Sequence, residues 1–292
     1  LPETWSDLAE AARFGAIRVA APQTFAQQVT SHLSAMAASV PGSDPFWFDA
    51  DSMTPVIDSE AHRRALEIWQ TLSSSTPESA RTGSTGDLWQ CLLDGSAEVL
   101  IARADFLPFA LERGFDLNRL YVAPLPGEPS FDGTIQRVGN AAGANWGGVT
   151  IDGLDRTGEV SRFLSSLSLP ASQTRFSVNP QNGITPAPND ANPDVGPFEA
   201  AGWPATPTAT WLGAIAETLW NPHQLPQLRI AETQRYLGTY ESRIVSFLDG
   251  AIASPDEALT AAADDWRTIT EAIGVETQQD LYRQSLMPAP PQ

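Results

Sequence analysis

The feature that most restricts the fold of this chain is a repeated order of elements, in which a short apolar run is followed by a helical pattern. "AIRVAA" at 16–21 precedes the amphipathic stretch 24–40, and "AEVLIA" at 97–102 precedes a helix expected from Phe106. Apolar runs of this length fit strands that are buried on both faces, and helices that connect such strands favour parallel pairing. The sequence therefore predicts an α/β fold.

Helical patterns dominate the rest of the chain. A first helix is expected over 1–14, because Thr4 can serve as its N-cap and Asp7 follows three residues later. Further helices are expected at 59–72, 87–93 and 159–169 and through most of the chain after Trp211. The segment 120–127 is expected to be a strand up to its two prolines, and 139–151 is a glycine-rich approach to a strand. The segment 179–210 is dense in Pro, Gly and Asn, so it is expected to be irregular surface, and the tail 287–292 is expected to fray.

The stretch "SPDEALTAAADDWRTITEAIG" at 254–274 has the start and stop signals of a complete helix. Ser254 is the expected N-cap, Glu257 closes a capping box, and Gly274 ends the helix. One apolar stripe runs along it at spacings of three and four, formed by Leu259, Ala262, Trp266, Ile269 and Ile273. This pattern predicts a structural helix that packs on a sheet.

Composition limits the classes of partner. The formal net charge is −18, and the chain contains no lysine. An acidic surface repels the phosphates of nucleic acids and of anionic membranes, so we expect no nucleic-acid partner. The single Cys91 permits no internal disulfide, and no apolar run approaches the length of a membrane span.

The sequence offers no motif of a metal, cofactor or catalytic site. His32, His62 and His223 are far apart, and the acidic residues of 49–58 lack the glycine and the distal glutamate of a calcium loop. G-x-S-x-G, G-x-G-x-x-G and a P-loop lysine are also missing from the sequence. We therefore expect no metal, no cofactor and no catalytic residue, although 35 carboxylates leave a pair for glycoside hydrolysis open.

Tryptophan is the residue type that points to a ligand. Four of the nine lie in loop-like or polar surroundings: Trp47, Trp146, Trp203 and Trp220. A flat aromatic face beside planar polar groups suits a sugar ring, whose C–H face stacks while its hydroxyls form hydrogen bonds. Trp146 is the strongest candidate, because Gly147 and Gly148 allow the backbone to approach a ligand closely. Packing is the alternative for each ring, and it is the expectation for those on apolar helical stripes: Trp69, Trp89 and Trp266.

Five segments follow one another in an order that is found in one protein family. "LPETWSDLAEAA" is similar to that family's P-x-T-W-x-E-L helix start, and "LLDGSAEVLIARADFLPF" to its F-x-x-G-x-A-A-M segment. "YVAPLPG" and "GGVTIDGLDRTGEVSRFLSSL" are similar to its next two segments, and "LDGAIASPDEALTAAADDW" to its G-x-x-S-x-E-E-A-L closing helix. The chain thus resembles the extracellular solute-binding proteins of ABC importers, in their sugar-binding, maltose-binding-protein-like group (family 1).

The resemblance implies a helix-rich α/β fold of two lobes, the type II periplasmic-binding-protein-like fold, with one lobe incomplete. It implies that 1–122 belongs to the second lobe, that 123–170 is the hinge and the return to the first lobe, and that 171–292 completes the second lobe. In the family a long segment precedes the P-x-T-W motif, so an N-terminal piece is expected upstream of residue 1. The implied location is periplasmic or extracellular, with a lipid anchor possible on that upstream piece.

The function that the resemblance implies is the binding of a small solute, a sugar or an oligosaccharide, in a cleft between the lobes for delivery to an ABC permease. The protein would act as a monomer and catalyse no reaction. By position, the expected ligand contacts are Gln23, Thr24, Phe25, Trp47, Arg103, Asp105, Phe106, Asn145, Trp146 and Gly147. Phe106 replaces the usual aromatic after the "AEVLIA" strand, and Arg103 could bind an acidic sugar or another anion.

Two other classes of protein stay open. One is a carbohydrate-active hydrolase, in which tryptophans line subsites and two carboxylates cleave the bond; a facing Asp/Glu pair beside Trp146 would favour it. The other is a degenerate binding domain with a structural or interaction role.

Overall fold

The computed structural model describes residues 2–21, 26–42, 45–81, 84–140, 157–186, 192–225 and 227–286. The chain divides into two compact units. Unit 1 comprises Leu1–Ile101, Pro126–Asn140 and His223–Gln292, and unit 2 comprises Ala102–Leu125 and Ala141–Pro222. Each unit is assembled from segments that are far apart in the sequence.

Unit 1 begins with the predicted capped helix. Helix α1 covers Trp5–Arg13, and the Thr4 hydroxyl oxygen accepts a hydrogen bond from the Asp7 N–H at 3.0 Å. The helix buries Trp5 and Leu8 and packs against α3, Glu60–Ser74. The prediction of an N-cap at Thr4 is therefore confirmed.

The two predicted apolar runs form the first sheet of unit 1. Strands β1, Val19–Ala20, and β2, Val99–Leu100, pair in parallel, with Val19 opposite Val99. The helices between them in sequence are α2 (Ala26–Ser39), α3, α4 (Glu78–Arg81) and α5 (Thr85–Leu93). The α/β order is thus confirmed, although each strand is only two residues long.

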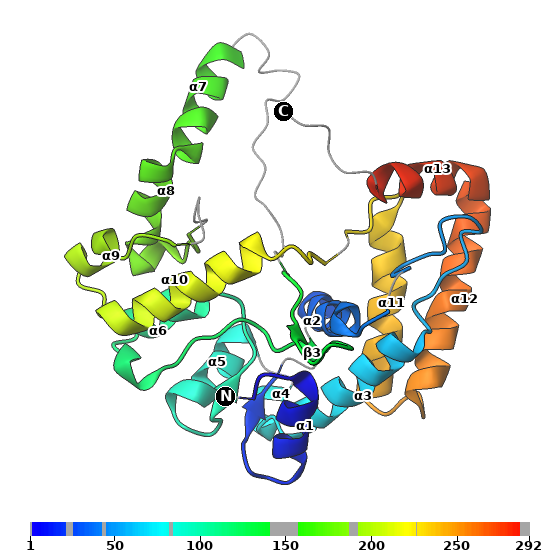
Figure 1. Ribbon diagram of the computed structural model, residues 1–292, viewed down its shortest axis with the longest axis horizontal. Helices are drawn as coiled ribbons and strands as arrows, with labels where there is room; N and C mark the ends of the chain where they lie inside the picture. The colour runs from blue at the N-terminus through cyan, green and yellow to red at the C-terminus, as the bar shows by residue number, and fades with distance from the viewer. Residues whose placement is uncertain are drawn as a thin grey trace. The chain divides into compact units, whose positions relative to one another are not determined.

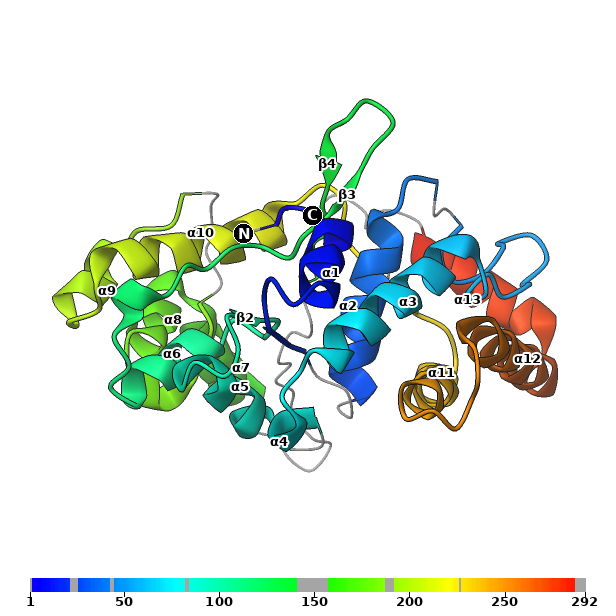
Figure 2. The same cartoon turned by 90° about the horizontal axis from the view of Figure 1, so that it is seen from below.

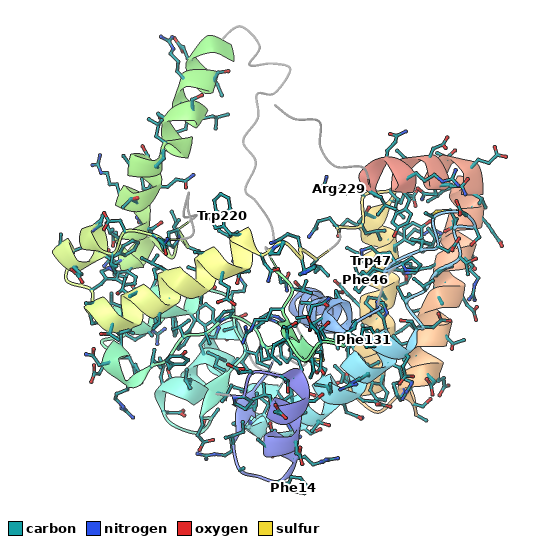
Figure 3. The ribbon with its side chains drawn as sticks, in the orientation of Figure 1. Phe14, Phe46, Trp47, Phe131, Trp220 and Arg229 are labelled. Atoms are coloured by element: carbon teal, nitrogen blue, oxygen red, sulfur yellow. The ribbon has the colours of Figure 1, made fainter. Side chains whose placement is uncertain are left out.

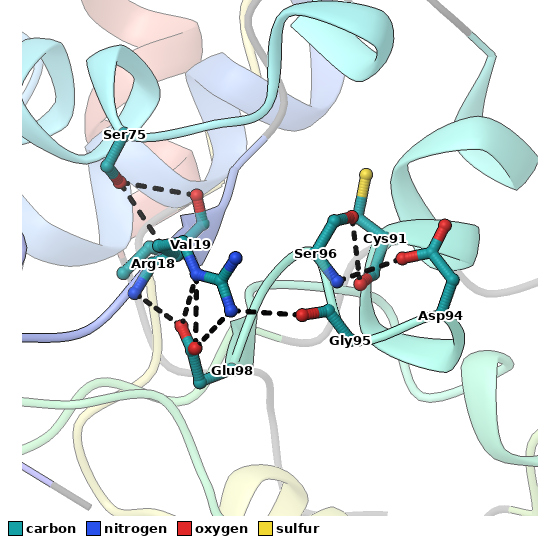
Figure 4. A network of polar contacts seen from close by, with 8 residues as sticks. All are labelled: Arg18, Val19, Ser75, Cys91, Asp94, Gly95, Ser96 and Glu98. Atoms are coloured by element: carbon teal, nitrogen blue, oxygen red, sulfur yellow. Dashed lines mark hydrogen bonds and ion pairs between the residues drawn. The ribbon is translucent and has the colours of Figure 1, made fainter.

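An ion pair fixes the register of this sheet (Figure 4). The Arg18 backbone N–H donates to Glu98 Oε2 at 2.7 Å, and Arg18 Nε donates to the same carboxylate at 3.1 Å. The guanidinium also donates to the Gly95 carbonyl at 3.0 Å. Hydrogen bonds from Arg18 hold the pKa of Glu98 below its ordinary value. Both side chains are about half exposed, so the pair orients the strands and adds little stability.

The strand predicted within 120–127, up to the two prolines, is wrong. Residues 121–126 form no strand, and pairing begins at Gly127, which bridges to Thr4. Pro124 and Pro126 lack the backbone N–H that a β-ladder requires, which explains why pairing begins only after them. Gly127 is needed where it lies, because a Cβ there would be 2.3 Å from the Gln136 carbonyl oxygen.

A short hairpin follows directly after Gly127 in unit 1 (Figure 2). Strand β3, Glu128–Pro129, pairs antiparallel with β4, Ile135–Gln136. Phe131 in the turn between them is almost fully exposed. Glu128 is buried instead, and its carboxylate ties the hairpin to α1 and α3 through Ser6 and Arg64.

The predicted closing helix is α12, Pro255–Ile273, and it packs differently than expected. Ser254 Oγ accepts from the Glu257 N–H at 3.1 Å, and Gly274 ends the helix with a φ of 112°. The buried stripe lies against other helices, chiefly α11 (Thr233–Leu248) and also α3, and not against a sheet (Figure 1). The two-stranded sheets of unit 1 are too small to cover a helix of this length. A last helix, α13, spans Val275–Leu286.

Trp266 on α12 is the centre of an aromatic core in unit 1. Its ring stacks on Phe48 with 5.1 Å between centroids and meets Tyr236 edge-on at 5.4 Å. Trp266 Nε1 donates to the Tyr236 carbonyl at 2.8 Å, so its one polar atom is satisfied. Burial raises the pKa of Tyr240, which also packs on Trp266. The expectation that Trp69 and Trp266 lie in the core is confirmed, and Trp89 is partly buried.

Unit 2 is helical in the part that the structure describes. Its elements are α6 (Phe106–Glu112), η1 (Leu117–Arg119), α7 (Thr157–Ser168), α8 (Pro170–Ser177), η3 (Pro180–Asn182), α9 (Gly196–Ala200) and α10 (Ala205–Trp220). The helices predicted from Phe106 and over 159–169 are therefore confirmed. The strand expected at the end of the glycine-rich stretch 139–151 lies outside the described residues, as does the tail 287–292.

The irregular surface predicted over 179–210 is wrong for its second half. Helix α9 and the start of α10 lie within it, because Pro197 and Pro204 occupy helix starts, where a missing N–H costs nothing. Trp203 is buried and stacks on Trp211 with 5.5 Å between centroids. Trp203 Nε1 also donates to the Val178 carbonyl at 2.8 Å, so this tryptophan packs the core of unit 2.

Among the described residues, no helix is both long and apolar enough to cross a lipid bilayer.

Candidate functional site

Six of the ten ligand contacts expected from the sequence lie outside the described residues. They are Gln23, Thr24, Phe25, Asn145, Trp146 and Gly147. The carboxylate pair that would favour a hydrolase was expected beside Trp146, so it also lies outside them. The four contacts that the structure places are Trp47 in unit 1 and Arg103, Asp105 and Phe106 in unit 2.

Trp47 is a buried side chain of unit 1. It is 4% exposed and meets Phe46 edge-on, with 4.4 Å between ring centroids (Figure 3). Its other ring neighbours include Trp266, at 5.9 Å. Trp47 therefore belongs to the aromatic core and offers no open face.

Arg103 and Asp105 form an ion pair just before α6 in unit 2. Arg103 NH2 lies 3.2 Å from Asp105 Oδ2, and the Arg103 side chain is 60% exposed. The second carboxylate oxygen, Asp105 Oδ1, is buried without a hydrogen-bond partner, although the side chain reaches the surface. Phe106, the first residue of α6, is buried. Arg103 and Asp105 together offer donors and an acceptor to a polar ligand, whereas an anion would have to compete with Asp105 for the guanidinium.

The last turn of α10 carries the most exposed tryptophan that the structure describes. Trp220 is labelled at the end of α10 in Figure 3. It is 55% exposed and borders an open hollow of about 410 Å³. The other residues that line the hollow are Gly213, Ala216, Glu217, Asn221 and Pro222. Glu217 precedes Trp220 by three residues, so the two side chains are neighbours on the same helix face. The hollow thus combines a flat aromatic face, a carboxylate and an amide.

Helix α10 connects this hollow to the Arg103–Asp105 pair. Trp211, in the middle of α10, donates from Nε1 to the Ala104 carbonyl at 2.9 Å, which anchors the segment between the two charges. Trp220 follows Trp211 by nine residues, or roughly 14 Å at ~1.5 Å per residue.

Glu217 and Asn221 line the hollow, and the contacts expected from the sequence do not include them. Trp220 stands in a polar context in the sequence, but the expected contacts do not include it. The available signal was the spacing of Glu217 and Trp220 at the end of an apolar helical stretch, together with the asparagine and proline that stop it. What the sequence could not show is that the Trp220 ring is left uncovered.

The described residues contain no group of three or more His, Cys, Asp and Glu side chains that could hold a metal ion. Asp105 and Glu217 lie in different places of unit 2, so the hollow offers one carboxylate and not a facing pair. The arrangement suits recognition of a ligand by stacking and hydrogen bonds.

Comparison with known proteins shows the fold. No family model matches the chain, and no curated protein matches it. Among solved structures, it is similar to maltose-bound T. maritima MalE3, with 18% identity, a TM-score of 0.66 and coverage of 92% of this chain and 66% of that one. It is also similar to a protein from Synechococcus sp. MITs9220 assigned as an oligosaccharide periplasmic-binding protein, with 16% identity, a TM-score of 0.58 and coverage of 94% and 68%.

The zinc complex of the Synechococcus protein gives the same result, with 16% identity, a TM-score of 0.53 and coverage of 93% and 66%. The chain therefore has the helix-rich α/β fold of the periplasmic-binding proteins, as the sequence resemblance implied. It spans about two thirds of the length of these neighbours.

Proposed function

We propose that this protein binds a carbohydrate, an oligosaccharide of two or more rings, and that it does so without chemical conversion. The observation that carries the proposal is the fold, which over 92% of the chain is similar to that of a maltose-bound protein. The exposed ring of Trp220 beside Glu217 and Asn221 supports it, because a sugar requires an aromatic face with hydrogen-bonding groups at its edge.

The ligand-contact set of this proposal has two parts. The described part is the Trp220 hollow together with Arg103 and Asp105, all in unit 2. Trp47 and Phe106 are buried. The remaining part is the set expected from the sequence: Gln23, Thr24, Phe25, Asn145, Trp146 and Gly147. The proposal includes export to the periplasm or the cell exterior, action as a monomer, and delivery of the sugar to an ABC permease.

Isothermal titration of the full chain tests the binding step. Maltose, maltotriose and maltotetraose are titrated in turn, and each sugar is analysed afterwards by chromatography for breakdown. We expect saturable binding of at least one oligosaccharide and its recovery intact. Absence of binding by all of these sugars would contradict the proposal, and breakdown of a bound sugar would establish the hydrolase instead.

A variant pair tests the role of the hollow. Trp220→Ala removes the exposed aromatic face, so we expect the affinity for the oligosaccharide to fall at least tenfold. Leu219→Ala is the matched control, since Leu219 is also exposed and adjacent in sequence but does not line the hollow. Equal affinities of the two variants would remove Trp220 from the site.

A further inference from the structure

The turn of the β3–β4 hairpin in unit 1 presents an uncovered phenylalanine. Phe131 lies in this turn and is 95% exposed, the largest exposed fraction among the large apolar side chains that the structure describes. Figure 2 shows the turn extending beyond α1 and α2 of the same unit, and Phe131 is labelled in Figure 3. Single exposed apolar side chains are common on protein surfaces, so a role for Phe131 depends on how it is held and on what surrounds it.

The turn around Phe131 is fixed by its own hydrogen bonds. The Ser130 N–H donates to the Thr134 carbonyl at 2.7 Å, and the Gly133 N–H donates to the Ser130 carbonyl at 3.0 Å. Asp132 Oδ1 accepts from the Thr134 N–H at 3.0 Å and from the Thr134 hydroxyl at 2.7 Å. Gly133 has a φ of 83°, the left-handed conformation that closes a hairpin loop of this kind. Because the loop is ordered in advance, little backbone freedom is lost when a partner covers Phe131.

The base of the hairpin is tied to the body of unit 1. The Gly127 N–H donates to the Glu3 carbonyl at 3.0 Å, and the Trp5 N–H donates to the Gly127 carbonyl at 3.0 Å. The buried Glu128 carboxylate accepts from Arg64 of α3 at 3.1 Å. The hairpin is therefore a fixed support for its turn, anchored to the start of α1 and to α3.

The charge beside Phe131 restricts what can cover it. Asp132 is the only residue with a formal charge in 129–136. Hydrogen bonds from Thr134 hold the pKa of Asp132 below its ordinary value, so this carboxylate is ionised at neutral pH. With a net charge of −18, the chain also repels an anionic membrane and a second copy of itself. The surface that fits the turn is therefore apolar opposite Phe131 and basic opposite Asp132.

We infer that the β3–β4 hairpin is a docking element for another protein, whose surface offers an apolar pocket to the Phe131 ring and a basic side chain to Asp132. Aromatic side chains that enter a pocket of the partner contribute most of the energy of many protein interfaces. The inference rests on the proposed function, in which the permease is the protein that receives the sugar. Phe131 lies outside the ligand-contact set of that proposal, so docking and sugar binding can be separated by mutation.

Two measurements on one pair of variants test it. Sugar affinity is measured by titration of the purified chain, and uptake of radiolabelled maltotriose is measured in cells that make the variant in place of this protein. Phe131→Ala should reduce the rate of uptake about tenfold or more and leave the affinity within about twofold of the wild type. Phe14→Ala is the matched control, because Phe14 is an exposed phenylalanine of the same unit that lies outside the hairpin. It should change neither quantity.

A second pair tests the charge. Asp132→Asn keeps the Oδ1 acceptor for Thr134, so the turn is retained, but it removes the negative charge. We expect uptake to fall about threefold or more, with the sugar affinity unchanged. Asp249→Asn makes the same change on an exposed residue of unit 1 outside the hairpin, and uptake should stay as in the wild type. Circular dichroism of all four variants checks that they are folded.

The outcomes separate the inference from the proposed function. Uptake that is unchanged in Phe131→Ala, or reduced equally in Phe14→Ala, overturns the inference and leaves the sugar binding intact. A folded Phe131→Ala variant with reduced sugar affinity also overturns it, since Phe131 would then act on the sugar. Unchanged uptake in Asp132→Asn overturns the basic side chain of the partner. If the wild type binds no sugar, the proposed function and the inference both fall.

Discussion

Trp266 in unit 1 and Trp220 in unit 2 show two different environments of the same residue type. Trp266 is fully buried, contacts Phe48 and Tyr236, and donates its N–H to a backbone carbonyl. Trp220 ends a helix with more than half of its surface exposed beside Glu217. A buried ring with a satisfied N–H stabilises a core, whereas an uncovered ring beside polar groups is available to a ligand.

The largest effect should come from the core. Trp266→Ala leaves a cavity where Phe48, Trp47 and Tyr236 meet, so we expect a loss of about 3–5 kcal/mol in the free energy of unfolding. Denaturant titration followed by circular dichroism measures it. Trp266→Phe keeps an aromatic ring and should cost clearly less. A loss below about 1 kcal/mol for the alanine variant would show that the core can collapse around the gap.

The two buried histidines of unit 1 should make its stability depend on pH. Burial lowers the pKa of His32 to about 4 and that of His62 to about 3, from an ordinary 6.5. The unfolded chain therefore binds more protons between these values, so stability is complete above pH 6.5 and falls as the pH drops. At about pH 5 each histidine should have cost about 2 kcal/mol relative to pH 8.

Unfolding free energies measured between pH 8 and pH 5 check this slope, above the range in which carboxylates are protonated. His32→Gln and His62→Gln should each remove about half of the slope, whatever they do to the stability itself. His223 is exposed, so His223→Gln is the matched substitution at the surface. If the slope is the same in the wild type and in all three variants, His32 and His62 do not cause the pH dependence of stability.

A smaller effect is expected where a charge is buried in unit 1. The Glu128 carboxylate accepts hydrogen bonds from Ser6 Oγ at 3.0 Å and from Arg64 NH2 at 3.1 Å, and it is 3% exposed. Glu128→Gln keeps the shape but loses the ion pair, so we expect a cost of about 2 kcal/mol. Glu98→Gln at the half-exposed pair with Arg18 should cost under about 1 kcal/mol. Thermal unfolding of both variants orders the two costs, and the reverse order would contradict this account.

The smallest effect on stability should come from the exposed tryptophan. Trp220→Ala removes a ring that the fold does not cover, so we expect the free energy of unfolding to change by no more than about 0.5 kcal/mol. The same variant should lose affinity for an oligosaccharide at least tenfold. A large loss of stability would show that Trp220 is a packing residue like Trp266, and it would contradict the contrast between the two tryptophans.

The local signals in the sequence were sufficient to predict helix caps and buried helix faces, because neighbours along the chain decide these features. Thr4 and Ser254 cap their helices, and the apolar stripe around Trp266 is buried, because capping and helical periodicity depend on residues within one or two turns. The resemblance of five short segments also indicated the α/β binding-protein fold that the solved structures share.

The sequence was insufficient to predict burial and packing where segments that are far apart in the chain decide them. Trp47, Trp203 and Trp220 all stand in polar or proline-containing surroundings, yet the first two are buried and only the third is exposed. The closing helix was expected on a sheet, but it packs on α11 and α3, which come from two separate parts of the chain. Prolines around α9 indicated irregular structure, although in the fold they begin helices.

The sequence by itself determined the helices, their caps, the acidic charge and the residue types suited to a sugar, since each of these depends on composition or on near neighbours. Only the tertiary structure decided which tryptophan keeps an open face, that Asp105 already pairs with Arg103, and that Glu217 stands beside Trp220 in a hollow. The physical reason is that exposure is settled by what the rest of the chain covers, and local propensity contains no information about that.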